Sequence, residues 1–248
     1  MGQVPQGFKI LLVGNGRLAA SLRVALQNSG ANVREWTRSA SVPSLADTIE
    51  EFDPSHIYLA VSDSAIEEIA LQNQKDFRTR TVVHFAGSRP SLHGVHAAHP
   101  LSTFSSRETP VVAEDFARIP FVLDRGGPPF SKLFPTLHNP SFEIDADDRR
   151  YYHALCSLSG NFTVLLWEAV TQRFESKLGL PKDALSIYRE QIFKNLAFAK
   201  SESVLTGPLV RGDRRTIDAH LASLAEHKES ALTEIYRSFI HLYQENVV

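Results

Sequence analysis

The sequence contains very little cysteine: Cys156 is the only one among 248 residues. A single cysteine excludes a disulfide within the chain and a zinc site built on several cysteines. Chains without disulfides are typical of reducing compartments. We therefore expect a cytoplasmic protein.

Long apolar runs and a strong charge of one sign are also missing. The apolar run nearest the N-terminus, residues 10–13, is too short for a signal-peptide core or a membrane span. The formal net charge is -2, and no basic tract could follow a phosphate backbone. We expect neither a membrane nor a nucleic acid as partner.

Short apolar runs alternate with helical patterns through residues 1–144. This alternation predicts an α/β domain with a doubly wound, mainly parallel sheet. The expected strands lie at 9–13, 32–36, 56–61, 81–85, 95–98, 121–123 and 142–144, with helices at 17–28 and from 64 to 72. The stretch 102–118 is expected to be a loop-rich connection.

Strand-like runs end after residue 144, and helical spacing takes over. Expected helices cover 147–178, a segment from Pro181 to about 199, then 216–226 and 229–244. The prediction is an α/β domain over 1–144 followed by an all-helical domain over 145–248. Asp213 or Thr216 is expected to cap the third of these helices.

One motif joins the first expected strand to the first expected helix. Gly14-Asn15-Gly16-Arg17-Leu18-Ala19 fits the pattern G-x-G-x-x-G/A of dinucleotide-binding Rossmann units. The first glycine permits the tight turn, and the second lets the backbone approach a pyrophosphate at the helix N-terminus. We assign Gly14, Asn15, Gly16, Arg17 and Leu18 to cofactor binding; the alternative is an ordinary turn.

The end of the second strand indicates which dinucleotide is bound. NAD sites place a carboxylate about twenty residues after the glycines, where this chain has Arg38 and Ser39. Arg38 can pair with a 2′-phosphate, and the Ser39 hydroxyl can hydrogen-bond it. The residues favour NADP over NAD, although Glu35 would make NAD possible if it ended the strand.

Loops after the third and fourth strands should line the same crevice. Val61 and Ser62 are assigned to the cofactor, as is Ser88 after the fourth strand. Asp63 is expected to cap the helix that begins near Ser64.

Three histidines, His93, His96 and His99, stand three residues apart in a segment that Gly94 and Pro100 keep from being helical. Strands alternate faces, so this spacing does not gather metal ligands, and we predict no metal site. His99 is a candidate for substrate binding or proton transfer; the alternative is a hydrogen-bonded structural histidine.

Small and polar residues interrupt the first helix of the second domain. An inward Asn161 needs partners, which a substrate or the nicotinamide carboxamide could supply. A neighbouring helix could supply them as well. Ser159 is a second candidate for proton transfer, and Cys156 is interpreted as a core residue.

Four features together resemble a known family: the glycine motif, residues 84–88, residues 98–104, and residues 205–224 with the run TGPLVRGD. They resemble Rossmann-like oxidoreductases that carry a helical C-terminal domain of unknown function. These are similar in layout to pyrroline-5-carboxylate reductase and to β-hydroxyacid-dehydrogenase-like proteins. The resemblance implies an NADP-type cofactor, a cleft between the domains and a homodimer formed through the helical domains. The chain departs from it at Ala86, where the family has serine, and at Ala98.

The leading hypothesis is a reductase or dehydrogenase that transfers hydride between NADP(H) and a small carbonyl, imine or hydroxy-acid substrate. No lysine stands where hydroxyacid dehydrogenases place their acid/base, so His99, Ser159 or a water would supply the proton. A site without a strong acid slightly favours an imine. The alternative is a non-catalytic dinucleotide-sensing or partner-binding protein on the same scaffold, whereas a hydrolase or metal enzyme lacks its motifs.

Overall fold

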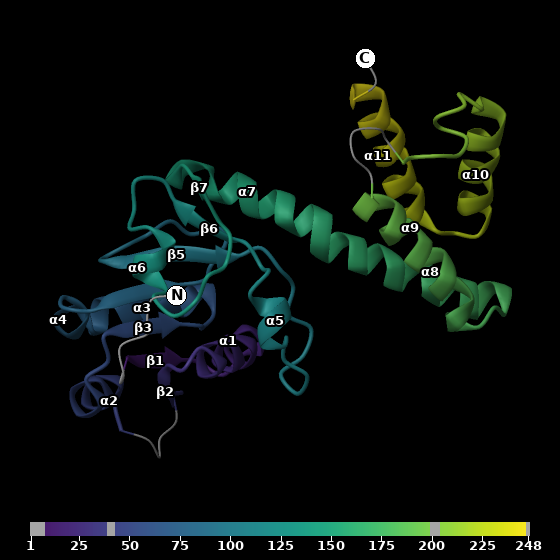
Figure 1. The fold of residues 1–248 in the computed structure, drawn as a ribbon. Coiled ribbons are helices and arrows are strands. Elements are labelled where there is room, and N and C mark those ends of the chain that lie inside the picture. Colours follow the sequence, from purple (N-terminus) through teal and green to yellow (C-terminus); the bar gives the residue numbers. More distant parts are fainter. Residues whose placement is uncertain (1–7, 39–42, 199–203, 247–248) are drawn as a thin grey trace. The chain divides into compact units, whose positions relative to one another are not determined.

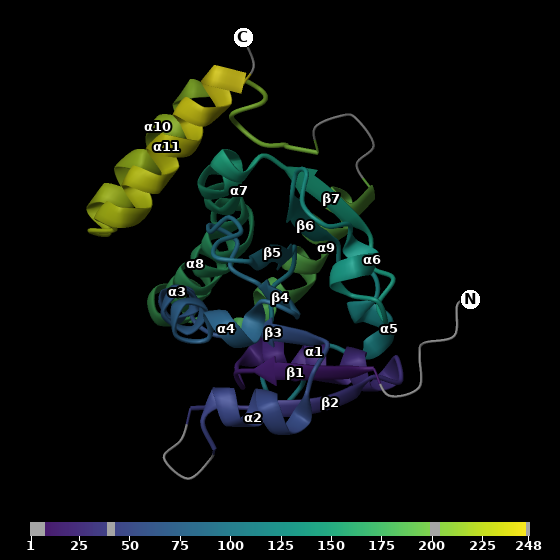
Figure 2. The same cartoon turned by 90° about the vertical axis from the view of Figure 1, so that its left-hand side faces the viewer.

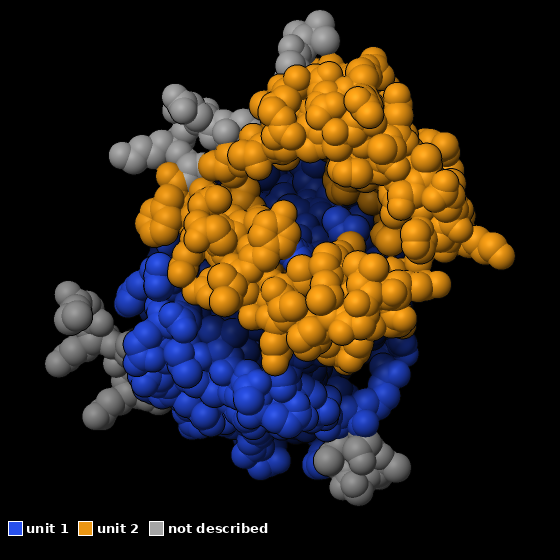
Figure 3. All heavy atoms as spheres, turned by 90° about the vertical axis from the view of Figure 1, so that its right-hand side faces the viewer, with its two compact units in different colours: residues 1–167 blue, residues 168–248 orange. Residues whose placement is uncertain are grey.

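The computed structural model describes residues 8–38, 43–198 and 204–246 (Figure 1). It divides into two compact units, residues 1–167 and 168–248, which are coloured separately in Figure 3. The first unit contains the sheet and the helices that cover it.

The first unit is built on a seven-stranded sheet with the order β2-β1-β3-β4-β5-β6-β7. Neighbouring strands run parallel except at the β5–β6 pair, so β6 and β7 point the opposite way. The carboxyl ends of the first five strands therefore share one edge. The strands are β1 (Lys9–Val13), β2 (Asn32–Trp36), β3 (His56–Leu59), β4 (Thr81–His84), β5 (Val95–Pro100), β6 (Phe121–Asp124) and β7 (Ser141–Ile144).

Helices cover both faces of the sheet because its central strands are apolar on both sides. Ile10 and Leu12 pack on one face with α1, α5 and α6, and Leu11 and Val13 pack on the other with α2, α3 and α4. Figure 2 shows α3 and α4 on one side of the strands and α5 and α6 on the other. These helices are α1 (Arg17–Asn28), α2 (Leu45–Phe52), α3 (Asp63–Gln72), α4 (Gln74–Phe77), α5 (Ala113–Phe116) and α6 (Phe130–Leu133). The predicted α/β class with a mainly parallel sheet is confirmed.

Four helices on this sheet, α2, α4, α5 and α6, were not predicted, and α3 was given the wrong cap. Helix α2 begins with a reciprocal capping box: Ser44 accepts from the Asp47 backbone, and Asp47 accepts from the Ser44 backbone. The Ser-x-x-Asp spacing was a readable signal for it. At α3 the prediction for Asp63 is wrong, because Ser62 occupies the N-cap position and Asp63 is the first helical residue.

A long helical segment leaves the sheet after β7. It comprises a 3₁₀ turn (Ala146–Asp148), α7 (Arg149–Cys156), a π-helical turn (Ser157–Asn161) and α8 (Phe162–Leu178). The second unit continues with a 3₁₀ turn (Lys182–Leu185), α9 (Ser186–Phe198), α10 (Arg214–Glu226) and α11 (Ser230–Asn246), in agreement with the predicted all-helical region. Asp213 caps α10 by accepting from the Thr216 backbone at 3.1 Å, as expected. Among the described residues, no helix is both long and apolar enough to cross a membrane.

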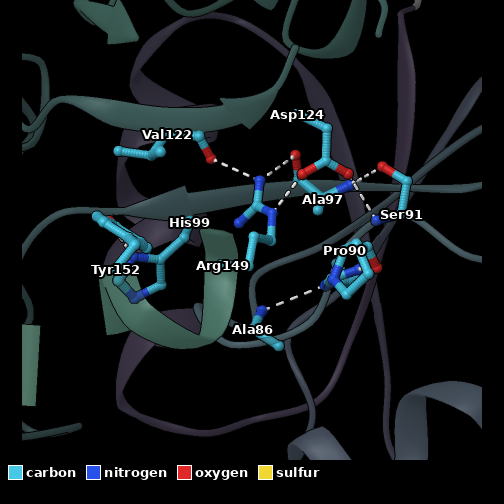
Figure 4. Close-up of polar contacts among 10 residues, drawn as sticks. Ala86, Pro90, Ser91, Ala97, His99, Val122, Asp124, Arg149 and Tyr152 are labelled. Carbon is cyan, nitrogen blue, oxygen red and sulfur yellow. Dashed lines mark hydrogen bonds and ion pairs between the residues drawn. The ribbon is translucent and has the colours of Figure 1, made fainter. Parts of the chain in front are cut away.

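The first residue of α7 ties the helix to the sheet. Arg149 is fully buried, and its Nε donates to the Asp124 carboxylate at the end of β6. Its Nη2 donates to the carbonyl oxygens of Val122 at 3.1 Å and Ala97 at 3.4 Å (Figure 4). The Asp124 carboxylate also accepts from the Ser91 backbone. Burial alone would raise the pKa of Asp124, but its hydrogen bonds to Ser91 and Arg149 lower it, so the pair is ionic.

Replacement of Arg149 by Met should destabilise the protein strongly. The change leaves the Asp124 charge buried without its partner, which typically costs about 3–5 kcal/mol. Arg125→Met is the matched control, since the Arg125–Asp145 pair is 64% and 63% exposed and should contribute less than about 1 kcal/mol. The free energy of unfolding from denaturant titration measures both. Equal losses in the two variants would contradict the anchoring role of Arg149.

Candidate functional site

Gly14 holds the loop after β1 against its neighbours. Its φ is +112°, a conformation that side-chain-bearing residues avoid, and its N–H donates to the Trp36 carbonyl at 2.8 Å. A Cβ at Gly14 would lie 2.2 Å from the carbonyl oxygen of Ala60. The loops after β1, β2 and β3 therefore meet at this glycine, at the carboxyl edge of the sheet.

Gly16 has a different role. It is the N-cap of α1 with an ordinary φ of -71°, and no side chain caps the helix there. A Cβ at Gly16 would have no atom within 4 Å, so the space in front of the helix N-terminus is open. Asn15 and Arg17 are exposed beside it. Uncapped backbone N–H groups facing open space suit a phosphate.

Arg38 follows the end of β2, and Glu35 lies within the strand. Arg38 is 66% exposed, and its Nη2 lies 3.8 Å from the Glu68 carboxylate of α3. Glu35 lies inside β2, which ends at Trp36, and it pairs with Arg23 at 2.9 Å. Ser39 lies outside the described residues. Glu35 thus has a partner on α1, and Arg38 keeps most of its surface available.

The other residues assigned to the cofactor lie at the same edge. Leu18 is half-buried against the core, and Val61 is half-buried in the loop after β3. Ser62 is exposed and makes no capping hydrogen bond with its side chain. Ser88, after β4, donates to the Asp63 carboxylate at 3.5 Å. Their roles toward a cofactor stay predictions.

His84, at the end of β4, is a structural histidine. It is completely buried, its Nδ1 accepts from the Ala86 backbone at 3.3 Å, and its Nε2 lies 3.1 Å from the Pro90 carbonyl. These two contacts fix the proton on Nε2. Burial lowers the pKa of His84 to about 4, so the ring is neutral with both nitrogens occupied.

His99, near the end of β5, has one nitrogen open. Its Nδ1 lies 2.7 Å from the Tyr152 hydroxyl of α7, while its Nε2 has no hydrogen-bond partner within the described parts of the chain (Figure 4). Burial, with the charges of His153 and Arg149, lowers the pKa of His99 to about 4. Burial and a hydrogen bond with Cys156 raise the pKa of Tyr152 well above its usual range. His99 is thus a neutral imidazole held by a neutral phenol.

His153 follows Tyr152 on α7 and meets the loop after β4. A Cβ at Gly87 would lie 2.2 Å from His153 Nδ1, a buried atom that has no hydrogen-bond partner among the described residues. The His99 and His153 rings are perpendicular, with centroids 5.4 Å apart. Sequence reasoning missed Tyr152 and His153. The available signal was the helical spacing of Arg149, Tyr152 and Cys156, which places them on one face.

The π-helical turn carries the remaining two candidates. Ser159 donates to the Leu155 carbonyl at 2.9 Å, inside its own helix, and Asn161 is exposed. Asn161 is therefore not a buried amide in need of partners in the single chain, and the roles of Ser159 and Asn161 stay predictions. A Cβ at Gly160 would lie 3.7 Å from the Thr103 methyl group, so the turn passes close to the loop after β5. Such turns are frequent at functional sites.

The spaced histidines do not converge. His93 lies in a turn with φ +49°, and His96 and His99 belong to β5. In the described ranges, no three His, Cys, Asp or Glu side chains lie together in a way that could hold a metal ion.

The comparison with solved structures gives the fold independently. The chain aligns with a candidate NADP oxidoreductase from Bacteroides fragilis at a TM-score of 0.72 and 23% identity, covering 97% of this chain and 99% of that one. A protein from Thermotoga maritima aligns at 0.68 and 22%, covering 95% and 97%. Pyrroline carboxylate reductase from Plasmodium falciparum, with NADP bound, aligns at 0.58 and 11%, covering 97% of each.

Residues 126–241 match the family model described as a domain of unknown function, DUF2520. The comparison with curated proteins gave no match. The fold is thus a Rossmann-type sheet followed by a helical C-terminal region, and the resemblance drawn from the sequence is confirmed for the fold.

Alanine substitutions should separate the roles of the two loop glycines. Gly14→Ala should cost at least about 1–3 kcal/mol of stability, because it combines a strained φ with a collision at Ala60. Gly16→Ala should change stability by less than about 1 kcal/mol, since its backbone is unstrained and its surroundings are open. The methyl group that Gly16→Ala adds should instead obstruct a phosphate at the helix N-terminus. Thermal unfolding and titration with NADPH measure the two effects; equal stability losses would contradict the distinction.

Proposed function

We propose that this protein is an NADP-dependent reductase or dehydrogenase acting on a small carbonyl, imine or hydroxy-acid substrate. The observation that carries the proposal is the glycine loop. Gly14 leaves no room for a side chain beside Ala60, whereas the space around Gly16, at the N-terminus of α1, is open. Structures of similar fold include a pyrroline carboxylate reductase with NADP bound and an imine reductase with NAD⁺.

The residues present fit a dinucleotide along the carboxyl edge. Backbone N–H groups of residues 15–18 would hold the pyrophosphate. Val61 and Ser62 would border the cofactor beyond β3, and Ser88 would contact it beyond β4. Bound NADP(H) supplies or accepts hydride at its nicotinamide ring.

The choice of NADP rests on Arg38. Its guanidinium is mostly exposed, and its single ion pair, with Glu68, is long. Exposed pairs of this kind contribute about 0–1 kcal/mol, so a 2′-phosphate would displace Glu68 readily. A phosphate dianion offers Arg38 shorter, charge-assisted hydrogen bonds. Glu35, which would bind the ribose hydroxyls of NAD, is engaged by Arg23.

Three residues are proposed for the substrate end. His99 presents an open ring nitrogen at the carboxyl end of β5. Ser159 and Asn161 lie in the π-helical turn that follows α7. His99 is the leading candidate for proton transfer, because its Nε2 makes no internal hydrogen bond among the described residues while the Ser159 hydroxyl bonds its own helix.

Arg38→Ala should weaken NADPH binding by about 10- to 100-fold, the worth of a hydrogen bond to a charged group. Binding of NADH should change little, because NADH has no 2′-phosphate. Arg78→Ala is the matched control, an exposed arginine before β4 at the opposite edge of the sheet. Titration of each variant with both cofactors measures the effect. Equal losses would contradict the 2′-phosphate assignment, and no binding of either cofactor by the unmodified protein would contradict the proposed function.

A homodimer through the helical region is proposed as well. Helices α8 and α9 have no buried residue, although both are rich in apolar side chains. The exposed ones include Leu165, Leu178, Ile187, Tyr188, Leu196 and Phe198. Apolar surface on this scale marks an interface, and a second copy of the chain is the commonest occupant.

The double variant Ile187→Glu/Leu196→Glu should convert the dimer to a monomer without loss of helix content. Both side chains are mostly exposed, at 78% and 55%, so a charge there disturbs only the association. Glu226→Lys on α10 is the control for a change of surface charge and should leave the dimer intact. Light scattering and circular dichroism measure mass and helicity. A monomeric unmodified protein would contradict the proposal.

A further inference from the structure

The contact between His99 and Tyr152 defines where the protons lie. Burial keeps both groups neutral, since it lowers the pKa of the imidazole and raises that of the phenol. A neutral imidazole carries one N–H, and the hydrogen bond at one nitrogen decides whether the other bears the proton. The relevant contact is the 2.7 Å separation between His99 Nδ1 and the Tyr152 hydroxyl.

The hydroxyl is the donor in this contact. A phenol O–H is a better donor than a neutral imidazole N–H, and an imidazole nitrogen is a better acceptor than a phenol oxygen. Donation from the Tyr152 hydroxyl to Nδ1 places the His99 proton on Nε2, the nitrogen without an internal partner among the described residues.

We propose that His99 and Tyr152 form a neutral proton relay that protonates the oxygen of a carbonyl substrate during its reduction. The relay rests on the oxidoreductase function proposed above. His99 is its catalytic residue, and Tyr152 is a positioning residue that also supplies a proton to His99.

In the reduction, the carbonyl carbon would accept hydride from a bound NADPH, and the C=O π electrons would move to the oxygen. The His99 Nε2–H bond breaks as the new substrate O–H bond forms, and the Tyr152 proton passes to His99 Nδ1. Return of that proton to the Tyr152 oxygen, with uptake of a proton from water at Nε2, restores the pair. The products are an alcohol, NADP⁺ and the hydroxide left by the water.

The relay favours a carbonyl over an imine. An imine that arrives protonated becomes a neutral amine on hydride transfer and needs no further proton. A carbonyl becomes an alkoxide, which does need one. The neutral His99–Tyr152 pair therefore reverses the slight preference for imines that the sequence suggested.

The first test reads the tautomer directly and needs no cofactor. Long-range ¹⁵N–¹H spectra of the full chain with ¹⁵N-histidine should show the His99 proton on Nε2. Tyr152→Phe should produce a mixture of tautomers, because the donor to Nδ1 is lost. Tyr151→Phe, at a neighbouring position that is 68% exposed, should leave the spectrum unchanged. A proton on Nδ1 in the unmodified protein, or no change in Tyr152→Phe, would overturn the relay.

The second test measures turnover of 2-ketoacids, ketones and cyclic imines with NADPH. Tyr152→Phe should lower kcat for carbonyl substrates on the order of 100-fold, the usual worth of general acid–base catalysis, with KM and NADPH affinity retained. An unchanged kcat, or turnover of imines alone, would overturn the relay. NADPH binding without turnover of any substrate by the unmodified protein would instead contradict the oxidoreductase function. The catalytic role of the relay would then fall with it, and the spectra alone would decide the tautomer.

Discussion

The buried ion pair between Arg149 and Asp124 is the constraint on which the rest of the first unit depends. It fixes the first residue of α7 beside β5 and β6, and the position of that residue sets where the rest of α7 begins. One turn later Tyr152 reaches His99, and His153 reaches Gly87. A buried charge pair seldom adds net stability over an apolar pair of the same volume. What the pair provides here is position, because it joins the first residue of α7 to the end of β6.

His84, which is buried, and His99, which is half-buried, differ in hydrogen bonding and not in charge state. Burial lowers both pKa values to about 4, but His84 has both nitrogens satisfied by its own loop. His99 has one nitrogen satisfied by α7 and the other open. A neutral histidine with an open, protonated nitrogen can donate a proton without first acquiring a charge. The same physical cause, desolvation, thus keeps neutral one histidine with both nitrogens hydrogen-bonded and one with a nitrogen open.

The glycine loop after β1 and the helices α8 and α9 are subject to different packing requirements. In the glycine loop, Gly14 packs closely against Ala60, whereas the space around Gly16 is open. The first shapes the turn, and the second leaves the room that the proposed phosphate would need. In the helical region, no side chain of α8 or α9 is buried by the described residues. A Rossmann unit can bury its own helices, whereas an extended helical segment needs further surface to cover it.

The sequence by itself determined the strands, the long helices and the position of the glycine loop, because hydrophobic period, glycine turns and caps are local signals. The capping box of Ser44 and Asp47 is a local signal of the same kind, so α2 was predictable from the sequence although it was not predicted. The His99–Tyr152 contact joins residues 53 positions apart, and the Arg149–Asp124 pair joins residues 25 apart. No local pattern encodes such contacts, since they depend on where α7 leaves the sheet. Only the tertiary structure decided which ring nitrogens of these histidines are hydrogen-bonded and which are left open.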